Sequence, residues 1–331
     1  MASRILGFVL EGTEGTEAVE VGTAVKLFGL LNKRDEPHPM TAYALEPVFQ
    51  EDVIDAVDLV AGSNFVKFKV KADYVHAWPF LLAMGKVEDL TGGVYRISFG
   101  TRSANPIPSF TVYSQLGTDV LVVRGCKMKE LNFHGEWPMP GEKPENHWIE
   151  MEIWGIASDA HDAITADPQA TMPAGLVNTK GKGFDQVPIK THGGNTLSNL
   201  TMIHVQIINQ LSYHGALGTS RDARGIVQEE GTLVVASFEN VLDFTAGDLL
   251  AAARATWSVG ADNDLVYKMR FNTAGTEYNT LQFENLRIVA SAATKSAKGA
   301  DQFASIGKPM YDGTNKSFTV TCLDGSTYAL L

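Results

Sequence analysis

Apolar and polar residues alternate along several short segments of the chain, which is the pattern of β-strands with one buried face. The clearest segment is Asn64–Lys71, where apolar residues take every second position and lysines the positions between: Val66, Phe68 and Val70 against Lys67, Lys69 and Lys71. Further strands are predicted at Thr41–Phe49, Tyr95–Phe99, Ser109–Tyr113, Leu200–Ile208, Thr232–Phe238 and Leu265–Phe271. The pattern therefore predicts a mainly β protein.

The segment Val120–Trp154 predicts a strand, a long turn and a second strand. Apolar residues alternate at Cys126 and Met128, then resume one step out of phase at Leu131 and Phe133. Because a one-residue shift moves side chains to the other face, we expect a β-bulge near Glu130 to absorb the extra residue. After the turn His134–Asn146, one face of the second strand is apolar and the other carries Trp and Glu: Ile149, Met151 and Ile153 against Trp148, Glu150, Glu152 and Trp154.

The same order of features returns near the C-terminus, which predicts an internal repeat. Alternation stops at a second phase slip, Glu284–Asn285, and a final strand follows with Phe318, Val320 and Cys322. Two pairs of segments match at an offset of 169 residues: Pro79–Met84 with Asp248–Ala253, and His147–Gly155 with Lys316–Asp324. We expect a second bulged strand at the second slip.

Helices, loops and the domain order complete this repeat. A short helix with Pro79 in its first turn and Gly85 at its end is predicted in the first copy, and a helix at Thr245–Thr256 in the second. A long charged loop precedes each helix: Gln50–Gly62 and Gln210–Gly231. We expect an N-terminal arm or loop at residues 1–40 and two domains at 41–172 and 173–331, each an antiparallel sheet packed by one helix.

Charge limits the classes of partner. The chain has 331 residues and a net charge of −11, of which residues 1–172 carry −10 and residues 173–331 carry −1. Such a chain is a poor nucleic-acid binder, because Lys and Arg supply most of the affinity for phosphates. No apolar run approaches the roughly 18 residues of a membrane helix, and no signal-peptide core follows the N-terminus, so we expect synthesis and folding in the cytoplasm and no membrane partner.

Candidate chemistry is sparse. The two cysteines, Cys126 and Cys322, fall in apolar core positions and are expected to be buried free thiols. Two polar clusters lack the spacing of known metal motifs and are interpreted as solvated loops: Asp159, His161, Asp162 and Asp167, and His134 and His147 with Glu136, Glu142 and Glu145. Phosphate-binding and nucleophile motifs do not occur. We therefore expect no enzyme activity, no cofactor and no metal.

The surface residues favour assembly over catalysis. Trp148 and Trp154 alternate with glutamates on a strand, and aromatic residues beside charges are typical of protein–protein contacts. The candidate assembly face is Trp148, Glu150, Glu152, Trp154, Lys67, Lys69 and Lys71. The candidate loop for contacts between assembled rings carries Arg221, Asp222, Arg224, Glu229 and Glu230.

The segment Ile107–Glu136 resembles the tail tube (major tail) proteins of tailed bacteriophages, of the type with two repeats. The resemblance rests on a PS-x-T-V strand followed by a G-C-K strand, whose residues here are Pro108, Ser109, Thr111, Val112, Gly125, Cys126 and Lys127. It implies two tandem tail-tube-like β-sandwich or partial-barrel domains, each with one flanking helix. It also implies a trimeric, pseudo-hexameric ring that stacks into the virion tail tube for DNA ejection.

Under this reading the partners are further copies of the chain, the tape measure protein and tail-end proteins, with double-stranded DNA only as passing cargo. An acidic bore would repel DNA phosphates, so Lys67, Lys69 and Lys71 are expected to point outward or to pair with acids such as Glu150 and Glu152 on a neighbouring strand. The alternative is a two-domain carbohydrate- or ligand-binding virion or surface protein that stacks sugars on Trp137, Trp148 or Trp154. A hydrolase is a third, weaker reading.

Overall fold

The computed structural model of the chain describes residues 4–16, 26–28, 30–34, 42–44, 59–61, 66–99, 107–116, 119–136, 146–159, 187, 189–193, 195–197, 200–214, 225–228, 232–241, 264–271, 275–284, 286–294, 302–309 and 317–330. These ranges contain β-strands in four antiparallel groups and a single α-helix. The predicted class, mainly β with minor α, is confirmed.

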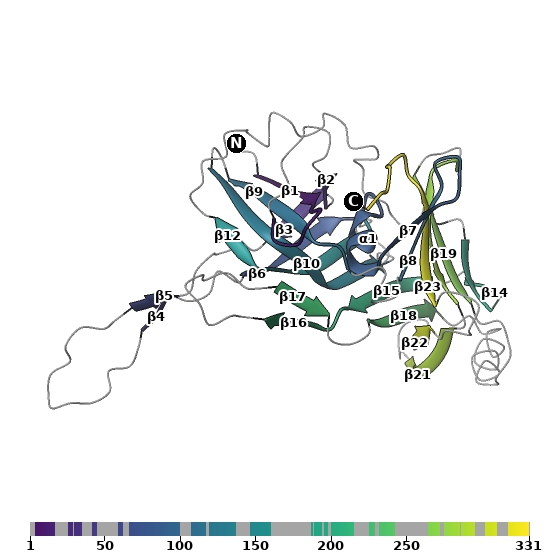
Figure 1. The fold of residues 1–331 in the computed structure, drawn as a ribbon. Helices are drawn as coiled ribbons and strands as arrows, with labels where there is room; N and C mark the ends of the chain where they lie inside the picture. Colours follow the sequence, from purple (N-terminus) through teal and green to yellow (C-terminus); the bar gives the residue numbers. More distant parts are fainter. Residues whose placement is uncertain are drawn as a thin grey trace, which may run out of the picture.

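The larger sheet has twelve strands (Figure 1): β1 (Arg4–Leu10), β2 (Lys26–Leu27), β3 (Leu30–Arg34), β6 (Val66–Asp73), β9 (Phe110–Leu116), β10 (Asp119–Glu136), β11 (Trp148–Gly155), β12 (Ala157–Asp159), β15 (Leu200–Ile208), β18 (Leu233–Val241), β21 (Leu286–Thr294) and β22 (Gln302–Pro309). Its main body runs in the order β3-β6-β11-β10-β15-β18-β22-β21. The first half of β10 pairs instead with β9 and β12, and β1 pairs with β9. The long strand β10 therefore joins the two parts of this sheet.

The smaller sheet has seven strands: β7 (Gly85–Asp89), β8 (Tyr95–Phe99), β13 (Ile189–His192), β14 (Asn195–Thr196), β19 (Leu265–Arg270), β20 (Tyr278–Phe283) and β23 (Phe318–Leu323). Its order is β14-β13-β19-β20-β23-β8-β7. Two separate ribbons complete the described strands: β4 (Ala42–Ala44) with β5 (Leu59–Ala61), and β16 (Leu211–His214) with β17 (Gly225–Gln228). In Figure 1 the β4–β5 ribbon projects from the body.

Helix α1 (Trp78–Met84) lies between β10 of the larger sheet and β7–β8 of the smaller one (Figure 1). Pro79 stands in its first turn, and Gly85 ends it in the left-handed conformation (φ 82°), with its N–H donating to the carbonyl of Leu81. All seven helical side chains are buried, as expected for a helix that is apolar on every side. The first predicted helix is confirmed, and the second, Thr245–Thr256, lies outside the described residues.

One hydrophobic core joins the sheets and α1. Its fully buried aromatic side chains come from both halves of the chain; Tyr74, Phe80 and Phe133 pack edge to face or tilted, and Phe283 stacks on Phe318. At roughly 1.5–3 kcal/mol for each large apolar side chain buried, this cluster supplies most of the stabilisation. Cys126 and Cys322 are buried free thiols in the core, as predicted.

Both sheets contain strands from both predicted domain ranges. In the larger sheet β10 pairs with β15, and in the smaller one β23 pairs with β8. The expected boundary between residues 172 and 173 lies outside the described residues and stays a prediction. Within the described part, the two ranges share their sheets and their core.

The first predicted bulge is confirmed and the second is replaced by a change of sheet. Between β10 and β11 the register shifts from Met128 to Glu130, so Lys129 is the extra residue. At the second phase slip β20 ends at Phe283 in the smaller sheet, and β21 begins at Leu286 in the larger one. The expected second bulged strand was wrong, because the chain accommodates the slip by leaving one sheet for the other.

The expected N-terminal arm and the two long loops need correction. β1 lies in the larger sheet between β2 and β9, and β3 pairs with β6, so residues 4–10 and 30–34 are part of the sheet. The strand expected over Thr41–Phe49 is limited to β4 among the described residues, and the loops Gln50–Gly62 and Gln210–Gly231 contain strands of the two ribbons. Apart from β1, these strands have two to five residues, which are too few to show alternation.

Candidate assembly surface

The outward face of the larger sheet brings the predicted assembly residues together. β6 pairs with β11 so that Lys71 stands opposite Glu150, Lys69 opposite Glu152 and Lys67 opposite Trp154. Buried positions alternate with exposed or partly buried ones along β6, and with partly buried ones along β11, as predicted. The expected pairing with an acid on a neighbouring strand is confirmed for Lys69, whose Nζ lies 3.9 Å from Glu152 Oε2.

The two tryptophans of this face are covered by neighbouring side chains. His134 on β10 stacks on Trp148 with ring centroids 3.7 Å apart, and Lys71 Nζ on β6 lies 3.7 Å from the same ring. Because β11 runs between β10 and β6, these two contacts approach Trp148 from opposite sides. Trp154 has Lys67 Nζ 4.2 Å and Lys129 Nζ 5.1 Å from its ring and donates its indole N–H to Glu152. Neither ring offers a free face for stacking a sugar, and Trp137 lies outside the described residues.

Hydrogen bonds continue this polar face onto β10 and β15. Glu130 accepts from Asn132 at 2.8 Å and from Gln206 at 2.7 Å, and a ring nitrogen of His204 lies 3.1 Å from the side-chain oxygen of Asn132. His204 also stacks on His134, with centroids 4.1 Å apart. The face is thus a connected layer of polar side chains across four strands.

The imidazole pair is held neutral by its surroundings. Partial burial, with the nearby charges of His204 and Lys71, lowers the pKa of His134 from 6.5 to about 3. Burial also lowers the pKa of His204, against an opposing effect of Glu130. Both rings therefore remain uncharged near neutral pH.

The two histidines that flank the predicted turn do not converge. His134 lies on the outward face, whereas His147 is buried, stacks on Phe133 and contacts the Tyr267 hydroxyl at 2.5 Å. Glu142 and Glu145, as well as His161, Asp162 and Asp167, lie outside the described residues. Within the described ranges, no three His, Cys, Asp or Glu residues gather in a way that could hold a metal.

The cysteine thiols are poor nucleophiles in this setting. Burial, with the nearby charge of Glu11, raises the pKa of Cys126. Burial, with the nearby charge of Asp324, raises the pKa of Cys322. A raised thiol pKa lowers the thiolate fraction, so neither residue is suited to covalent chemistry.

The candidate ring-contact residues Arg221, Asp222, Arg224, Glu229 and Glu230 lie outside the described residues. The β16–β17 ribbon that flanks them is described, and it packs on the body through a small cluster around Ile107, Ile156, Leu211 and Ile226. Trp154 and Tyr213 pack against the same cluster. The ribbon thus lies over one end of the candidate assembly face.

The body also has open sheet edges. Among the described strands, the main body of the larger sheet ends at β21 on one side, which pairs only with β22, and at β3 on the other. β21 has nine residues and a single charged one, Arg287, whereas the five residues of β3 include Lys33 and Arg34. Charged residues on an edge discourage pairing with another chain, so β21 is the less protected edge.

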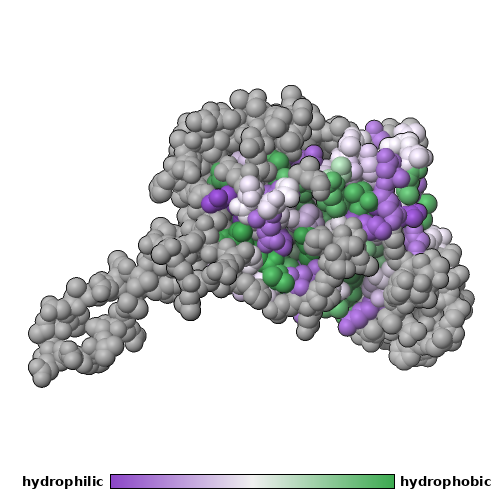
Figure 2. Space-filling model, viewed as in Figure 1, coloured by the Kyte–Doolittle hydropathy of each residue, from purple (hydrophilic) through white to green (hydrophobic). Residues whose placement is uncertain are grey.

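Exposed apolar residues are scattered rather than gathered. The large hydrophobic residues exposed among those described lie on four different strands: Ile189, Val227, Leu233 and Ile306. Figure 2 shows hydrophobic and hydrophilic residues interspersed over the described part of the visible face. The described surface therefore favours edge pairing and polar contacts over one large apolar interface.

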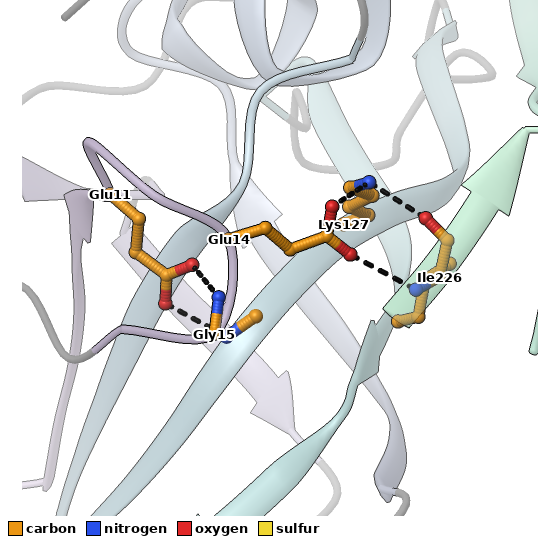
Figure 3. Close-up of polar contacts among 6 residues, drawn as sticks. Glu11, Glu14, Gly15, Lys127 and Ile226 are labelled. Carbon is orange, nitrogen blue, oxygen red and sulfur yellow. Dashed lines mark hydrogen bonds and ion pairs between the residues drawn. The ribbon is translucent and has the colours of Figure 1, made fainter. Parts of the chain in front are cut away.

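Sequence reasoning missed a second set of polar residues, Glu11, Glu14 and Lys127 (Figure 3). Glu11 is buried and accepts hydrogen bonds from Thr111 Oγ1 and Gly125 N–H at 2.8 Å and from Gly15 N–H at 2.9 Å. Glu14 and Lys127 contact each other and the backbone of Ile226. Apart from Glu11 with Gly15, these partners lie about a hundred residues or more apart in sequence, so no local pattern could have paired them.

Comparisons with known proteins add no family. No model of a protein family matches the chain, and no characterised protein shows a significant match to it. In the described residues, no helix is both long and apolar enough to cross a membrane.

Proposed function

We propose that the chain is a structural protein of a bacteriophage virion that assembles into stacked rings and forms the tail tube, the conduit for DNA ejection. The observation that carries the proposal is the larger sheet, which unites both halves of the chain and ends at the weakly charged edge strand β21. Such an edge presents unpaired N–H and C=O groups, and pairing it with another copy would satisfy them.

The polar face of this sheet is consistent with a structural role. Part of its charge is matched within the chain, because Lys69 and Lys71 on β6 stand opposite glutamates on β11. The net charge of −11 favours a bore that conducts DNA over a surface that binds it, since rows of Lys and Arg would bind DNA by releasing counterions. In this role DNA is passing cargo, and the tape measure and tail-end proteins are the further partners.

The edge strand provides the test. Along β21 successive backbone N–H groups point alternately toward β22 and away from it. Because proline removes one N–H, proline at one of two successive positions removes a bond to β22, and at the other it removes an outward N–H. We expect one of Ala292→Pro and Ala293→Pro to keep the fold and to lose ring assembly, judged by circular dichroism and negative-stain electron microscopy.

Proline at the edge strand of the smaller sheet is the matched control. Val87→Pro and Glu88→Pro on β7 sample both directions in the same way, and the folded one should still assemble. If the folded β21 variant assembles as the unmodified chain does, β21 is not the assembling edge.

A further inference from the structure

The turn Glu11–Thr16, which follows β1, contacts the β16–β17 ribbon through Glu14 and Lys127 (Figure 3). Glu14 Oε2 lies 2.6 Å from Lys127 Nζ. The second carboxylate oxygen, Oε1, accepts from the Ile226 N–H at 3.0 Å, and Lys127 Nζ donates to the Ile226 carbonyl at 2.7 Å. Three residues from β10, β17 and the N-terminal turn thus close a ring of charge-assisted contacts.

The polarity of this ring matches that of a peptide group. In an antiparallel ribbon the N–H and C=O of one residue point to the same side, either toward the partner strand or away from it. Ile226 stands opposite Tyr213 of β16, yet both of its backbone groups bind Glu14 and Lys127. They therefore point to the side of β17 away from β16, where a third strand would pair.

A two-stranded ribbon is only marginally stable alone, so the contacts that hold it on the body set the direction in which it extends from the body. β17 pairs with β16 alone in the described part of the chain, and the apolar contacts to the body come from a small cluster. Lys127 is largely buried, with 10% of its side chain exposed, which strengthens its attraction to Glu14.

We propose that Glu14 and Lys127 form a latch that replaces a third strand on β17 and couples the N-terminal turn to the direction of the β16–β17 ribbon. The Glu14 carboxylate accepts from the Ile226 N–H, and the Lys127 ammonium donates to the Ile226 C=O. The latch therefore depends on which residue carries which charge. Glu11 positions the turn that carries Glu14, because its hydrogen bonds to Gly15 and Gly125 fix this turn on β10. This inference concerns the single chain and does not rest on the proposed tube function.

The test is hydrogen–deuterium exchange of the isolated chain, read on peptides spanning Leu211–His214 and Gly225–Gln228. We compare Glu14→Ala, the charge swap Glu14→Lys with Lys127→Glu, and the unmodified chain. The swap keeps opposite charges, but it places an ammonium group against the Ile226 N–H and a carboxylate against the Ile226 carbonyl, so the hydrogen bonds to both backbone groups are lost. We expect both variants to exchange roughly tenfold faster in the ribbon, a change of about 1.4 kcal/mol in local opening.

Two controls keep the outcome clear. The ion pair of Lys86 and Glu88, 3.1 Å apart, lies on β7 in the smaller sheet, so the same charge swap there should leave ribbon exchange unchanged. Peptides from β19 and β20 report global stability and should not change in any variant. Ribbon protection restored by the Glu14–Lys127 swap would show an ordinary ion pair and overturn the latch, as would unchanged exchange in Glu14→Ala.

Discussion

Individual side chains on the outward face are set by cross-strand neighbours rather than by their own sequence context. His134 illustrates this, because Trp148 and His204 stack on it from the two adjacent strands. Lys71 contacts the same tryptophan, and Glu130 lies beside His204 through the Asn132 and Gln206 amides. The sequence showed these residues to be polar, but nothing local indicated that the two imidazoles would stack.

This environment predicts acid sensitivity. The pKa of His134 is about 3 in the folded chain and near 6.5 when unfolded, so between these values the unfolded chain binds more protons. Stability should therefore fall as pH drops from about 6.5 towards 3. Substituting His134→Phe keeps an aromatic ring on Trp148 and removes the titration, so the urea midpoint of this variant should fall less between pH 7 and pH 4.5. An equal fall in the variant and the unmodified chain would contradict this cause.

Strands and turns show which features the sequence could predict. The phase slip at Met128–Leu131 predicted the bulge because one face of β10 must stay buried. The identical slip after Phe283 led to a different outcome, a change of sheet, because the choice depends on which partner strands are available. The strands of the ribbons were missed because they are too short to show alternation, and the N-terminal strand β1 was missed because its partner β9 is distant in sequence.

A second irregularity in β10 depends on a glycine. The register to β9 shifts between Val123 and Cys126, where Gly125 has φ 61° and lies against Ile156. A Cβ there would stand 2.3 Å from Ile156 Cγ1, so Gly125→Ala adds a steric clash to the cost of a left-handed backbone. We expect a loss of at least about 2 kcal/mol in the free energy of unfolding, measured by urea denaturation.

Two other glycines separate these contributions. Gly92 has φ 66° and open space around a Cβ, so Gly92→Ala should cost about 1 kcal/mol from the backbone alone. Gly12 has open space and no such backbone, so Gly12→Ala should be close to neutral. Equal losses at Gly125 and Gly92 would mean that Ile156 moves aside without cost.

The molecule as a whole combines features that the sequence predicted separately. Composition and alternation predicted a mainly β chain, and the repeat signature matched β11 with β23; each has one apolar face in the core, but β11 lies in the larger sheet and β23 in the smaller one. What the repeat could not predict is that both halves contribute to both sheets, because equivalent strands can pair within a copy or between copies. The proposed assembly adds strand pairing between chains, with β21 as the edge that pairs with another copy.

The most direct test of this account is the symmetry and mass of the particles that the purified chain forms. If one chain supplies two tube-type repeats, class averages should show rings of three chains with six similar lobes, each chain contributing 35.8 kDa. Native mass spectrometry of the same sample should give the trimer as the smallest ring. A chain that stays monomeric at all concentrations, or rings of six complete chains, would contradict the account.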